Sequence, residues 1–253
     1  MKIAKYSANG NDFVIFHDSE KKQRGELAKI LCHRQDGIGA DGLIVVVPHE
    51  TYDFEWEFYN SDGSHADMCG NGSRACAHYA FNNDLAPFKM AFVTGAGVIN
   101  AEVSENTPKS GMVLSELTPP QILDQNIQHN GKKWWLINTG VPHLVSLQDD
   151  IEKFDIEEAR ELRYIYNANV NVCCIEASGN MFVRTYERGV EDETLACGTG
   201  MSACFYRAFV EKKVQNNIEV YPTSKDTLYL GYNGNTITFK GRVKKTFEVE
   251  WEL

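Results

Sequence analysis

Short apolar runs separated by polar turns extend along most of the chain, and many of these runs alternate apolar and polar residues with a period of two. This alternation is typical of strands that bury one face. We predict strands over residues 3–5, 13–16, 43–47, 54–59, 112–117, 134–138, 170–175, 181–186 and 236–239. In the last segment, Phe247, Val249 and Trp251 alternate with charged residues, which predicts that the chain ends as a strand.

Helical patterns are fewer. Leu27, Ile30 and Leu31 have helical spacing, and Asp155 with Glu158 resembles a capping box that opens a helix over residues 156–164. Pro119-Pro120 follows a predicted strand near the middle of the chain, where proline stops both a helix and a strand ladder. We therefore expect a first domain over residues 1–117 and a second from residue 118.

One eight-residue motif occurs twice. CGNGSRAC begins at Cys69 and CGTGMSAC begins at Cys197, and both have the pattern C-G-x-G-x-x-A-C. An apolar run ending in Phe58-Tyr59-Asn60 precedes the first copy, and one ending in Thr185-Tyr186-Glu187 precedes the second. The copies begin 128 residues apart (197 minus 69), about half the chain. This predicts two domains built alike, each with a strand, a loop and a helix that starts at the motif.

Composition narrows the class of protein. A chain of 253 residues with 43% hydrophobic content is long enough for two ordinary cores. The net charge of −10 and the pI of about 5.2 argue against nucleic acid or an anionic membrane as partner, and favour a small-molecule ligand. No apolar stretch approaches a membrane span and the N-terminus turns polar early, so we expect a cytoplasmic protein.

The seven cysteines do not read as a disulfide framework or a metal site. Their number is odd, and no C-x-x-C pair occurs. We expect no metal, and we interpret Cys32, Cys173 and Cys174 as fillers of the core.

The repeated motif has a chemical meaning. Two glycines before a helix let backbone N–H groups converge on an anion such as a carboxylate. A cysteine at the same helix start has its thiolate favoured by the helix dipole, so its pKa can fall below the usual value of about 8.5. Two such helices directed at one ligand would supply a base and an acid on opposite sides of a carbon next to a carboxylate, as inversion by α-proton transfer requires. Phosphate binding is a weaker alternative, because neither loop has the P-loop ending or the full G-x-G-x-x-G spacing.

The motifs together resemble the diaminopimelate epimerase family. The resemblance spans nearly the whole chain and is carried by Gly10-Asn11-Asp12-Phe13-Val14, Gly37-Ile38-Gly39-Ala40-Asp41-Gly42, Asn60-Ser61-Asp62-Gly63, Met68-Cys69-Gly70-Asn71-Gly72, Gly140 with Pro142-His143, Glu187-Arg188-Gly189 and Ala196-Cys197-Gly198-Thr199-Gly200. It implies an α/β (α+β) fold of two pseudo-symmetric domains, each a mostly antiparallel sheet or barrel around a central helix. Residues 118–242 would form the second domain, and a last strand over 243–253 would return to the first.

The resemblance also implies the activity and the roles of residues. The reaction would interconvert LL- and meso-diaminopimelate, on the route to lysine and peptidoglycan, without pyridoxal phosphate or metal, in a homodimer. Cys69 and Cys197 would be the acid–base pair in a site between the domains, with His143 and Glu187 as supporting residues beside the thiols. The substrate would be bound by Asn11, Asn60, Gly70, Asn71, Asn169, Glu187, Arg188, Gly198 and Thr199. Arg188 suits the distal carboxylate because its planar fork can bind both oxygens.

Three features depart from the commoner family pattern. Gly42 stands where a substrate-contacting glutamine is frequent, Val141 replaces the asparagine of G-N-P-H, and the segment between Arg188 and Cys197 is one residue longer. Asn171 is a near rival of Asn169, which we prefer because it precedes Glu187 by eighteen residues.

Two other classes of protein remain open. One is a cofactor-free racemase of the proline type, against which Glu187-Arg188 and Asn60 argue. The other is a thiol redox or metal-binding protein. We predict that Cys69 and Cys197 form a disulfide on oxidation, with loss of an activity that a reductant restores.

Overall fold

The computed structural model describes residues 1–252, which fall into two compact units. The first unit consists of residues 1–116 together with the chain from Lys240 onward, and the second consists of Leu117–Phe239. The boundary near Glu116 lies just before Pro119-Pro120, and the second crossing lies within the last strand.

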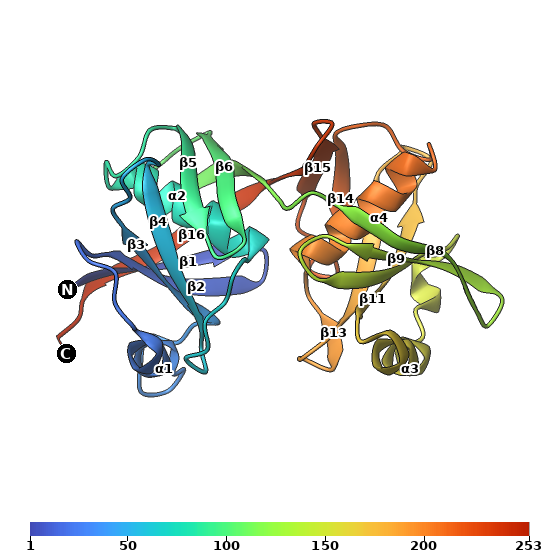
Figure 1. Cartoon of the computed structure of the whole chain (residues 1–253), viewed down its shortest axis with the longest axis horizontal. Coiled ribbons are helices and arrows are strands. Elements are labelled where there is room, and N and C mark those ends of the chain that lie inside the picture. The colour runs from blue at the N-terminus through green and yellow to red at the C-terminus, as the bar shows by residue number, and fades with distance from the viewer. Residues whose placement is uncertain (253) are drawn as a thin grey trace. The chain divides into compact units, whose positions relative to one another are not determined.

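The first unit is an eight-stranded barrel (Figure 1). Its strands follow one another around the barrel in chain order, and the last strand pairs with the first to close it. They are β1 (Lys2–Ala8), β2 (Asn11–His17), β3 (Gly42–Val47), β4 (Phe54–Asn60), β5 (Lys89–Thr94), β6 (Gly97–Ser104), β7 (Ser110–Glu116) and β16 (Ile237–Glu250). Helix α2 (Gly70–Asn82) is buried at every position from Gly70 to Ala80, because the strands enclose it. Helix α1 (Gly25–Cys32) packs on β3 and β4.

The second unit has a sheet of similar build around α4 (Gly198–Val210). The strand order is β15-β14-β12-β11-β10-β9-β8, with β13 paired to β12. The strands are β8 (Gln121–His129), β9 (Lys132–Asn138), β10 (Pro142–Leu147), β11 (Asn169–Ile175), β12 (Met181–Glu187), β13 (Asp192–Thr194), β14 (Ile218–Tyr221) and β15 (Leu228–Tyr232). A short 3-10 turn, η1 (Ile151–Lys153), leads into α3 (Ile156–Tyr166), which packs on β11 and β12.

Corresponding strands pair in the same way in both units. In the first unit, β2 pairs with β3 in parallel and β3 pairs with β4 antiparallel. In the second unit, β10 pairs with β11 in parallel and β11 pairs with β12 antiparallel. This shared pairing confirms the predicted fold of two similar units, each mostly antiparallel around a central helix.

The predicted elements are present, and three details differ from the expectation: the last strand, the cap of α3 and the burial of one cysteine. The strands predicted at 236–239 and at the chain end are one long strand, β16, which stops at Glu250, before Trp251. Asp155 caps α3 by accepting the N–H groups of Glu157 and Glu158 at 3.0 and 3.1 Å. The reciprocal half of the predicted capping box is absent, because the Glu158 carboxylate pairs with Lys132. Cys32 and Cys173 are buried as predicted, but Cys174 is only partly buried.

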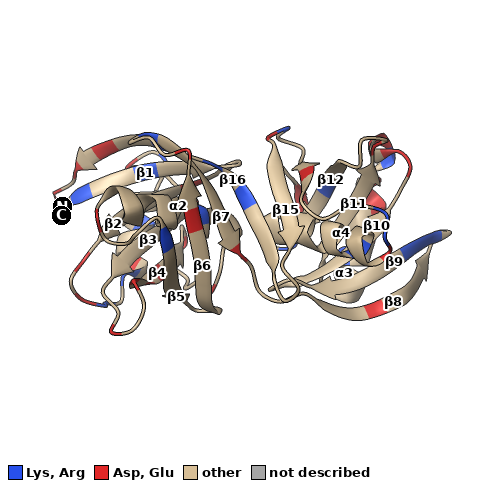
Figure 2. Cartoon of the chain, turned by 90° about the horizontal axis from the view of Figure 1, so that it is seen from above, with Lys and Arg blue, Asp and Glu red and all other residues tan. Residues whose placement is uncertain are grey.

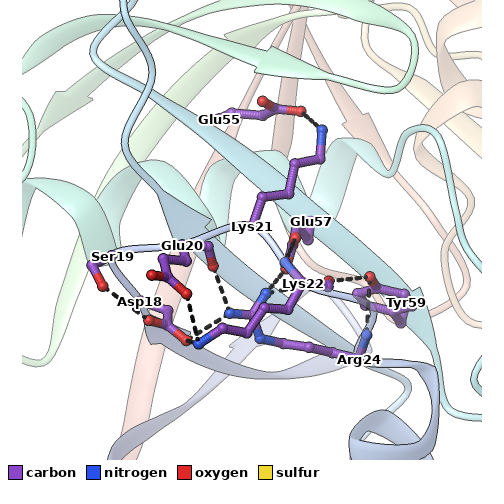
Figure 3. A network of polar contacts seen from close by, with 9 residues as sticks. All are labelled: Asp18, Ser19, Glu20, Lys21, Lys22, Arg24, Glu55, Glu57 and Tyr59. Carbon is purple, nitrogen blue, oxygen red and sulfur yellow. Dashed lines mark hydrogen bonds and ion pairs between the residues drawn. The ribbon is translucent and has the colours of Figure 1, made fainter.

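A buried polar network joins the start of α1 to β4 (Figure 3). The Arg24 guanidinium contacts the carboxylates of Glu57 and Asp18, the latter at 2.6 Å. The Tyr59 hydroxyl accepts the Arg24 N–H at 3.2 Å and donates to the Lys22 carbonyl at 3.1 Å. Buried ionic groups of this kind are costly unless paired, so the network fixes α1 against the strand that ends at Asn60.

Charged residues are distributed over both units. Both acidic and basic positions occur along the ribbon of each unit (Figure 2). Within residues 1–252, no helix has both the length and the apolar character that a membrane crossing needs.

Candidate functional site

The first half-site is the N-terminus of α2. Cys69 is the N-cap residue, with an extended backbone (φ −147°, ψ 118°), and its Sγ accepts the N–H of Gly72 at 3.4 Å. The first backbone N–H groups of a helix have no intrahelical acceptor, and they carry the positive end of the helix dipole. The sulfur therefore lies where a negative charge is stabilised.

Asn71 is held by one residue of the barrel and by one of its own helix. Its Nδ2 donates to Asn11 Oδ1 at 2.6 Å, and its Oδ1 accepts from the Arg74 guanidinium. Asn11 Nδ2 in turn donates to Asp41 Oδ2 at 3.1 Å. Asn11 and Asn71 are thus brought into one hydrogen-bonded chain that runs from α2 to the start of β2.

An ionic cluster that includes Asp41 supports this series of hydrogen bonds. Asp41 and Asp12 share Arg34, whose Nη2 lies 2.7 Å from Asp41 Oδ1 and 3.1 Å from Asp12 Oδ1, and Lys5 Nζ lies 3.0 Å from Asp12 Oδ2. Burial by itself would raise the pKa of Asp12, but Arg34 and Lys5 outweigh it and hold that pKa below its ordinary value. The Asp12 carboxylate therefore remains ionised, and Arg34 links it to Asp41, which accepts the hydrogen bond that orients Asn11.

Asn60 and Gly42 are opposite each other at the same end of the barrel, as partners in the β3–β4 ladder. Asn60 is exposed, and its Nδ2 donates to Ser64 Oγ at 2.9 Å. A Cβ at position 42 would lie 2.8 Å from the Tyr59 carbonyl oxygen and 2.7 Å from the Phe58 ring. Steric crowding therefore explains why this position holds glycine, because a larger residue would fit only if the strand moved.

The second half-site is the N-terminus of α4. Cys197 is the N-cap residue (φ −121°, ψ 107°) and is 9% exposed. Its Sγ lies 3.6 Å from Thr199 Oγ1, and Thr199 Oγ1 lies 3.0 Å from His143 Nε2. Thr139 Oγ1 donates to the Thr199 carbonyl at 2.8 Å and so fixes the first turn.

His143 reaches the cysteine through Thr199. Its ring is fully buried, and burial lowers its pKa to about 3. Asn171 Nδ2 lies 3.1 Å from His143 Nδ1 and donates to the Leu144 carbonyl at 2.9 Å. A neutral imidazole is therefore held between Asn171 and Thr199.

The remaining predicted residues gather at the ends of β11 and β12. Asn169 Oδ1 accepts the backbone N–H of Arg188 at 2.8 Å, and Arg188 Nη1 donates to the Asn167 carbonyl at 3.0 Å. Burial raises the pKa of Glu187, a shift that the nearby Thr194 hydroxyl opposes. The longer segment before Cys197 includes β13, a short strand paired with β12, while Val141 lies exposed in the turn before β10.

Each unit therefore brings its own set of predicted residues together. The first holds Cys69, Gly70, Asn71, Asn11 and Asn60, and the second holds Cys197, Gly198, Thr199, His143, Asn169, Glu187 and Arg188. The sequence reasoning missed Asp41, Arg74 and Thr185 as supports, and it treated Asn171 only as a rival for substrate. Asn171 is fully buried, with its amide engaged by Thr185, Leu144 and His143. Two of these supports lay within quoted motifs, Asp41 in G-I-G-A-D-G and Arg74 in C-G-N-G-S-R-A-C, so the sequence offered a signal for them.

Comparison with known proteins gives a consistent result. The family model described as diaminopimelate epimerase matches residues 3–123 and 135–229. The diaminopimelate epimerase of a Nitratiruptor species is 59% identical over 98% of this chain and 97% of its own, and that of Campylobacter lari is 52% identical over the full length of both. That of Helicobacter pylori is 40% identical over 96% of this chain and 94% of its own.

Solved structures share the fold at low identity. A probable proline racemase from Agrobacterium radiobacter has a TM-score of 0.76 at 13% identity, covering 100% of this chain and 93% of that one. A PhzF-family phenazine biosynthesis protein of Bacillus anthracis has a TM-score of 0.74 at 18% identity, covering 100% and 99%. At these identities the likeness is one of fold.

Proposed function

The chain belongs to the diaminopimelate epimerase family, and on that premise we propose that it interconverts LL-2,6-diaminopimelate and meso-diaminopimelate by proton transfer between two cysteines. This is an isomerase reaction on the route to lysine and to peptidoglycan precursors. The observation that carries the mechanism is that two buried helices, α2 and α4, each begin at a cysteine in the N-cap position. No cofactor enters the proposal.

The proposed reaction takes one proton from the α-carbon and returns a different proton to its opposite face, so that one C–H and one S–H bond break while one of each forms. One thiolate takes the α-hydrogen as a proton, and the electron pair of the C–H bond passes into the carboxylate to give a planar, enediolate-like intermediate. The other thiol then gives its proton to the opposite face of the carbon and is left as the thiolate. Backbone N–H groups of Gly70, Asn71, Gly198 and Thr199, at the positive ends of the two helices, would stabilise the carboxylate as its charge grows.

We assign the recognition of substrate to polar groups around the two helix starts. Asn11 and Asn60 would contact it from the first unit, and Asn169, Glu187 and Arg188 from the second. Arg188 suits the distal carboxylate, since a guanidinium can donate two parallel hydrogen bonds to it. The raised pKa of Glu187 is consistent with a carboxylate that gains its partner, an ammonium group, only when substrate binds.

Epimerisation in deuterated water tests the function. The reduced protein is given LL-diaminopimelate, and optical rotation and deuterium at the α-carbons are followed together. We expect inversion with deuterium at one centre, and loss of turnover by at least about a thousandfold in Cys69→Ala and Cys197→Ala. The matched controls are Cys76→Ala and Cys204→Ala, which remove the second cysteine of each motif, fully buried in the core, and leave both helix starts intact.

Other outcomes would change the assignment. Well-folded protein that neither turns over nor exchanges diaminopimelate, but exchanges the α-proton of proline, would be a racemase of another substrate class. An oxidised form more active than the reduced one would identify a thiol redox protein. Full activity in either Cys69→Ala or Cys197→Ala would refute the two-thiol mechanism.

We also propose that the protein acts in the cytoplasm as a homodimer. The support is the biosynthetic reaction of the family, together with a sequence whose seven cysteines do not read as a disulfide framework. Sedimentation equilibrium of the reduced protein at micromolar concentration checks the assembly, and a mass near 28.5 kDa, that of one chain, would contradict it.

A further inference from the structure

The second glycine of the C-G-x-G motif has different neighbours in the two half-sites. A Cβ on Gly72 would meet only apolar atoms, of Ile44 at 3.3 Å and Phe13 at 3.4 Å besides the Cβ of Cys69. A Cβ on Gly200 would lie 2.3 Å from Asn171 Oδ1 and 3.2 Å from Thr185 Oγ1. The same motif therefore packs against an apolar surface in one unit and a polar one in the other.

Strand register shows that these neighbours are equivalent residues. Ile44 pairs with Phe58 across β3 and β4, and Asn171 pairs with Thr185 across β11 and β12. On the other side, Phe13 and His143 occupy matching places in the parallel ladders β2–β3 and β10–β11. Where the first unit has Phe13, Ile44 and Phe58, the second therefore has His143, Asn171 and Thr185.

The polar set is as deeply buried as the apolar one. His143 and Asn171 are 0% exposed and Thr185 is 3% exposed. Burying three polar side chains is costly unless each finds its partners. Here they satisfy one another, because Thr185 Oγ1 donates to Asn171 Oδ1 at 2.9 Å and the Asn171 amide nitrogen faces His143. In the first unit, apolar residues fill the equivalent positions, so packing alone does not explain why the second unit has polar residues there.

Hydrogen-bond direction supplies that reason. The Leu144 carbonyl can only accept, so the amide nitrogen of Asn171 must face both Leu144 and His143. Nδ1 of His143 is then the acceptor, and the ring proton lies on Nε2, which donates to Thr199 Oγ1. The hydroxyl hydrogen of Thr199 is left for the sulfur of Cys197.

We propose that Asn171 is a positioning residue that holds His143 in the Nε2–H tautomer, so that Thr199 donates its hydroxyl hydrogen to the Cys197 thiolate. We call Asn171, His143 and Thr199 the relay. The relay acts on Cys197; in the first unit, Asn71 stands where Thr199 stands in the motif, and its side chain is bound to Asn11 and Arg74. The inference rests on the proposed role of Cys197 and deepens it.

Other ionisable groups near the relay leave the direction of its hydrogen bonds unchanged. Arg188 opposes a positive charge on His143, and the low pKa of that ring, about 3, keeps it neutral at working pH. Cys204 on α4 and its neighbour Cys173 on β11 lie in the same core, and burial raises the pKa of Cys204 well above the ordinary value, so it stays a neutral thiol. Glu187, at the end of β12, also has its pKa raised by burial.

Thiol alkylation without substrate tests the relay directly. The rate of iodoacetamide modification of the Cys197 peptide is measured by mass spectrometry against pH, in a Cys69→Ala background. We expect Asn171→Leu and Thr199→Val to move the midpoint upward by about one pH unit, which is about a tenfold slower rate at fixed pH below the midpoint. Thr199→Ser keeps the hydroxyl and should restore the original midpoint.

Two controls separate the relay from general damage. Thr185→Val removes a hydrogen bond to the same amide but leaves the Leu144 carbonyl to orient it, so the midpoint should stay within about 0.3 pH unit of the parent. The midpoint of Cys69, measured in Cys197→Ala, should not respond to Thr199→Val. An unchanged Cys197 midpoint in folded Thr199→Val overturns the proposal, as does a Cys69 midpoint that moves equally.

The tautomer itself is observable by ¹⁵N NMR of histidine-labelled protein, with the His143 signals assigned by their loss in His143→Gln. We expect a protonated Nε2 and an unprotonated Nδ1 throughout pH 5 to 9. A proton on Nδ1 refutes the relay even if epimerase activity is present. An intact tautomer with no activity on diaminopimelate leaves the relay standing and refutes only the proposed substrate.

Discussion

The starts of α2 and α4 share the sequence C-G-x-G and the same backbone form, yet they use the third position in opposite ways. In α2, the Asn71 side chain is bound by Asn11 and Arg74. In α4, the Thr199 side chain lies between the sulfur of Cys197 and the ring of His143. The motif therefore determines where each cysteine lies, and the strands behind it determine what the cysteine contacts.

This difference shows how a duplicated fold can hold two similar residues in different states. Both cysteines have the helix N-terminus, which favours a thiolate in either unit. Cys197 is linked through Thr199 to a buried imidazole, and it stands before a polar set of residues that the first unit replaces with aromatic and aliphatic ones. An enzyme that removes and returns a proton needs one thiol charged and the other neutral. A difference between the surroundings of the two cysteines would favour this state before substrate binds.

The largest difference in stability between the two units should come from alanine in place of the second glycine of each motif. In Gly200→Ala the new Cβ displaces the Asn171 amide, which several hydrogen bonds anchor, whereas in Gly72→Ala its nearest neighbours are apolar side-chain atoms at 3.3 and 3.4 Å, which need to move by only a few tenths of an ångström. We expect a loss in free energy of unfolding of about 3 kcal/mol for Gly200→Ala and of about 1 kcal/mol for Gly72→Ala. Urea denaturation measures both, and equal losses would contradict the difference in packing.

Exchange of the third motif residues tests the division of roles. Thr199→Asn removes the hydroxyl from the relay, and we expect kcat to fall about a hundredfold. Asn71→Thr frees Asn11 and Arg74, and we expect KM to rise about tenfold with a smaller change in kcat. Steady-state kinetics with LL-diaminopimelate measures both constants. A fall in kcat in Asn71→Thr as large as that in Thr199→Asn would show that the half-sites are equivalent.

The pH dependence of stability should separate the buried imidazole from its apolar counterpart, Phe13. The pKa of His143 falls from 6.5 to about 3 on folding, so the unfolded chain binds one more proton between these values. Stability therefore falls as pH drops below 6.5, by about 2 kcal/mol at pH 5. Burial raises the pKa of Glu187, which acts in the opposite sense in any variant that keeps that residue.

His143→Gln isolates the contribution of the imidazole. We expect the variant to be less stable than the parent at pH 7.5 and to lose less stability than the parent between pH 7.5 and 5, by about 2 kcal/mol. Urea denaturation at the two pH values gives the difference. The same pH slope in both proteins would place the titration elsewhere.

Much of this arrangement was predictable from the sequence because it depends on local patterns. Short apolar runs, several of them with period-two alternation, located nine strands, and the duplicated motif located both helix starts. Among the strands that were missed, two show how a local pattern can fail. β8 (Gln121–His129) is largely exposed and mostly polar, and β13 (Asp192–Thr194) is too short to show a period. Their formation depends on pairing with β9 and β12, which is not visible in one segment alone.

The inequality of the two half-sites was not predictable in the same way. It depends on which residues of β10, β11 and β12 pack behind Gly200, and these residues are separated by tens of positions in the chain. Asn171 and Asn169 are two residues apart on one strand, so both point to the same face. Only tertiary packing shows that Asn171 is fully enclosed, while Asn169 lies at the strand end beside Arg188. Residue type alone offered no means of distinguishing them.

The smallest effects should come where the two units are alike. Tyr59 and Tyr186 precede equivalent strand ends, and both hydroxyls bond to backbone groups outside the barrel strands. Tyr59 binds Arg24 N–H and Lys22 O, and Tyr186 donates to the Glu191 carbonyl at 2.8 Å. Phenylalanine at either position keeps the buried ring and removes one hydroxyl, so we expect each variant to lose about 1 kcal/mol of unfolding free energy.

Urea denaturation of Tyr59→Phe and Tyr186→Phe, each with the epimerase rate measured beside it, completes the comparison. The two losses should agree within about 0.5 kcal/mol, and kcat should change less than about threefold, because neither hydroxyl contacts a cysteine or the relay. A large fall in kcat for Tyr186→Phe alone would mean that the inequality between the units extends beyond the residues packed behind Gly200. A similar small loss in both would confine that inequality to the helix starts and the strands directly beneath them.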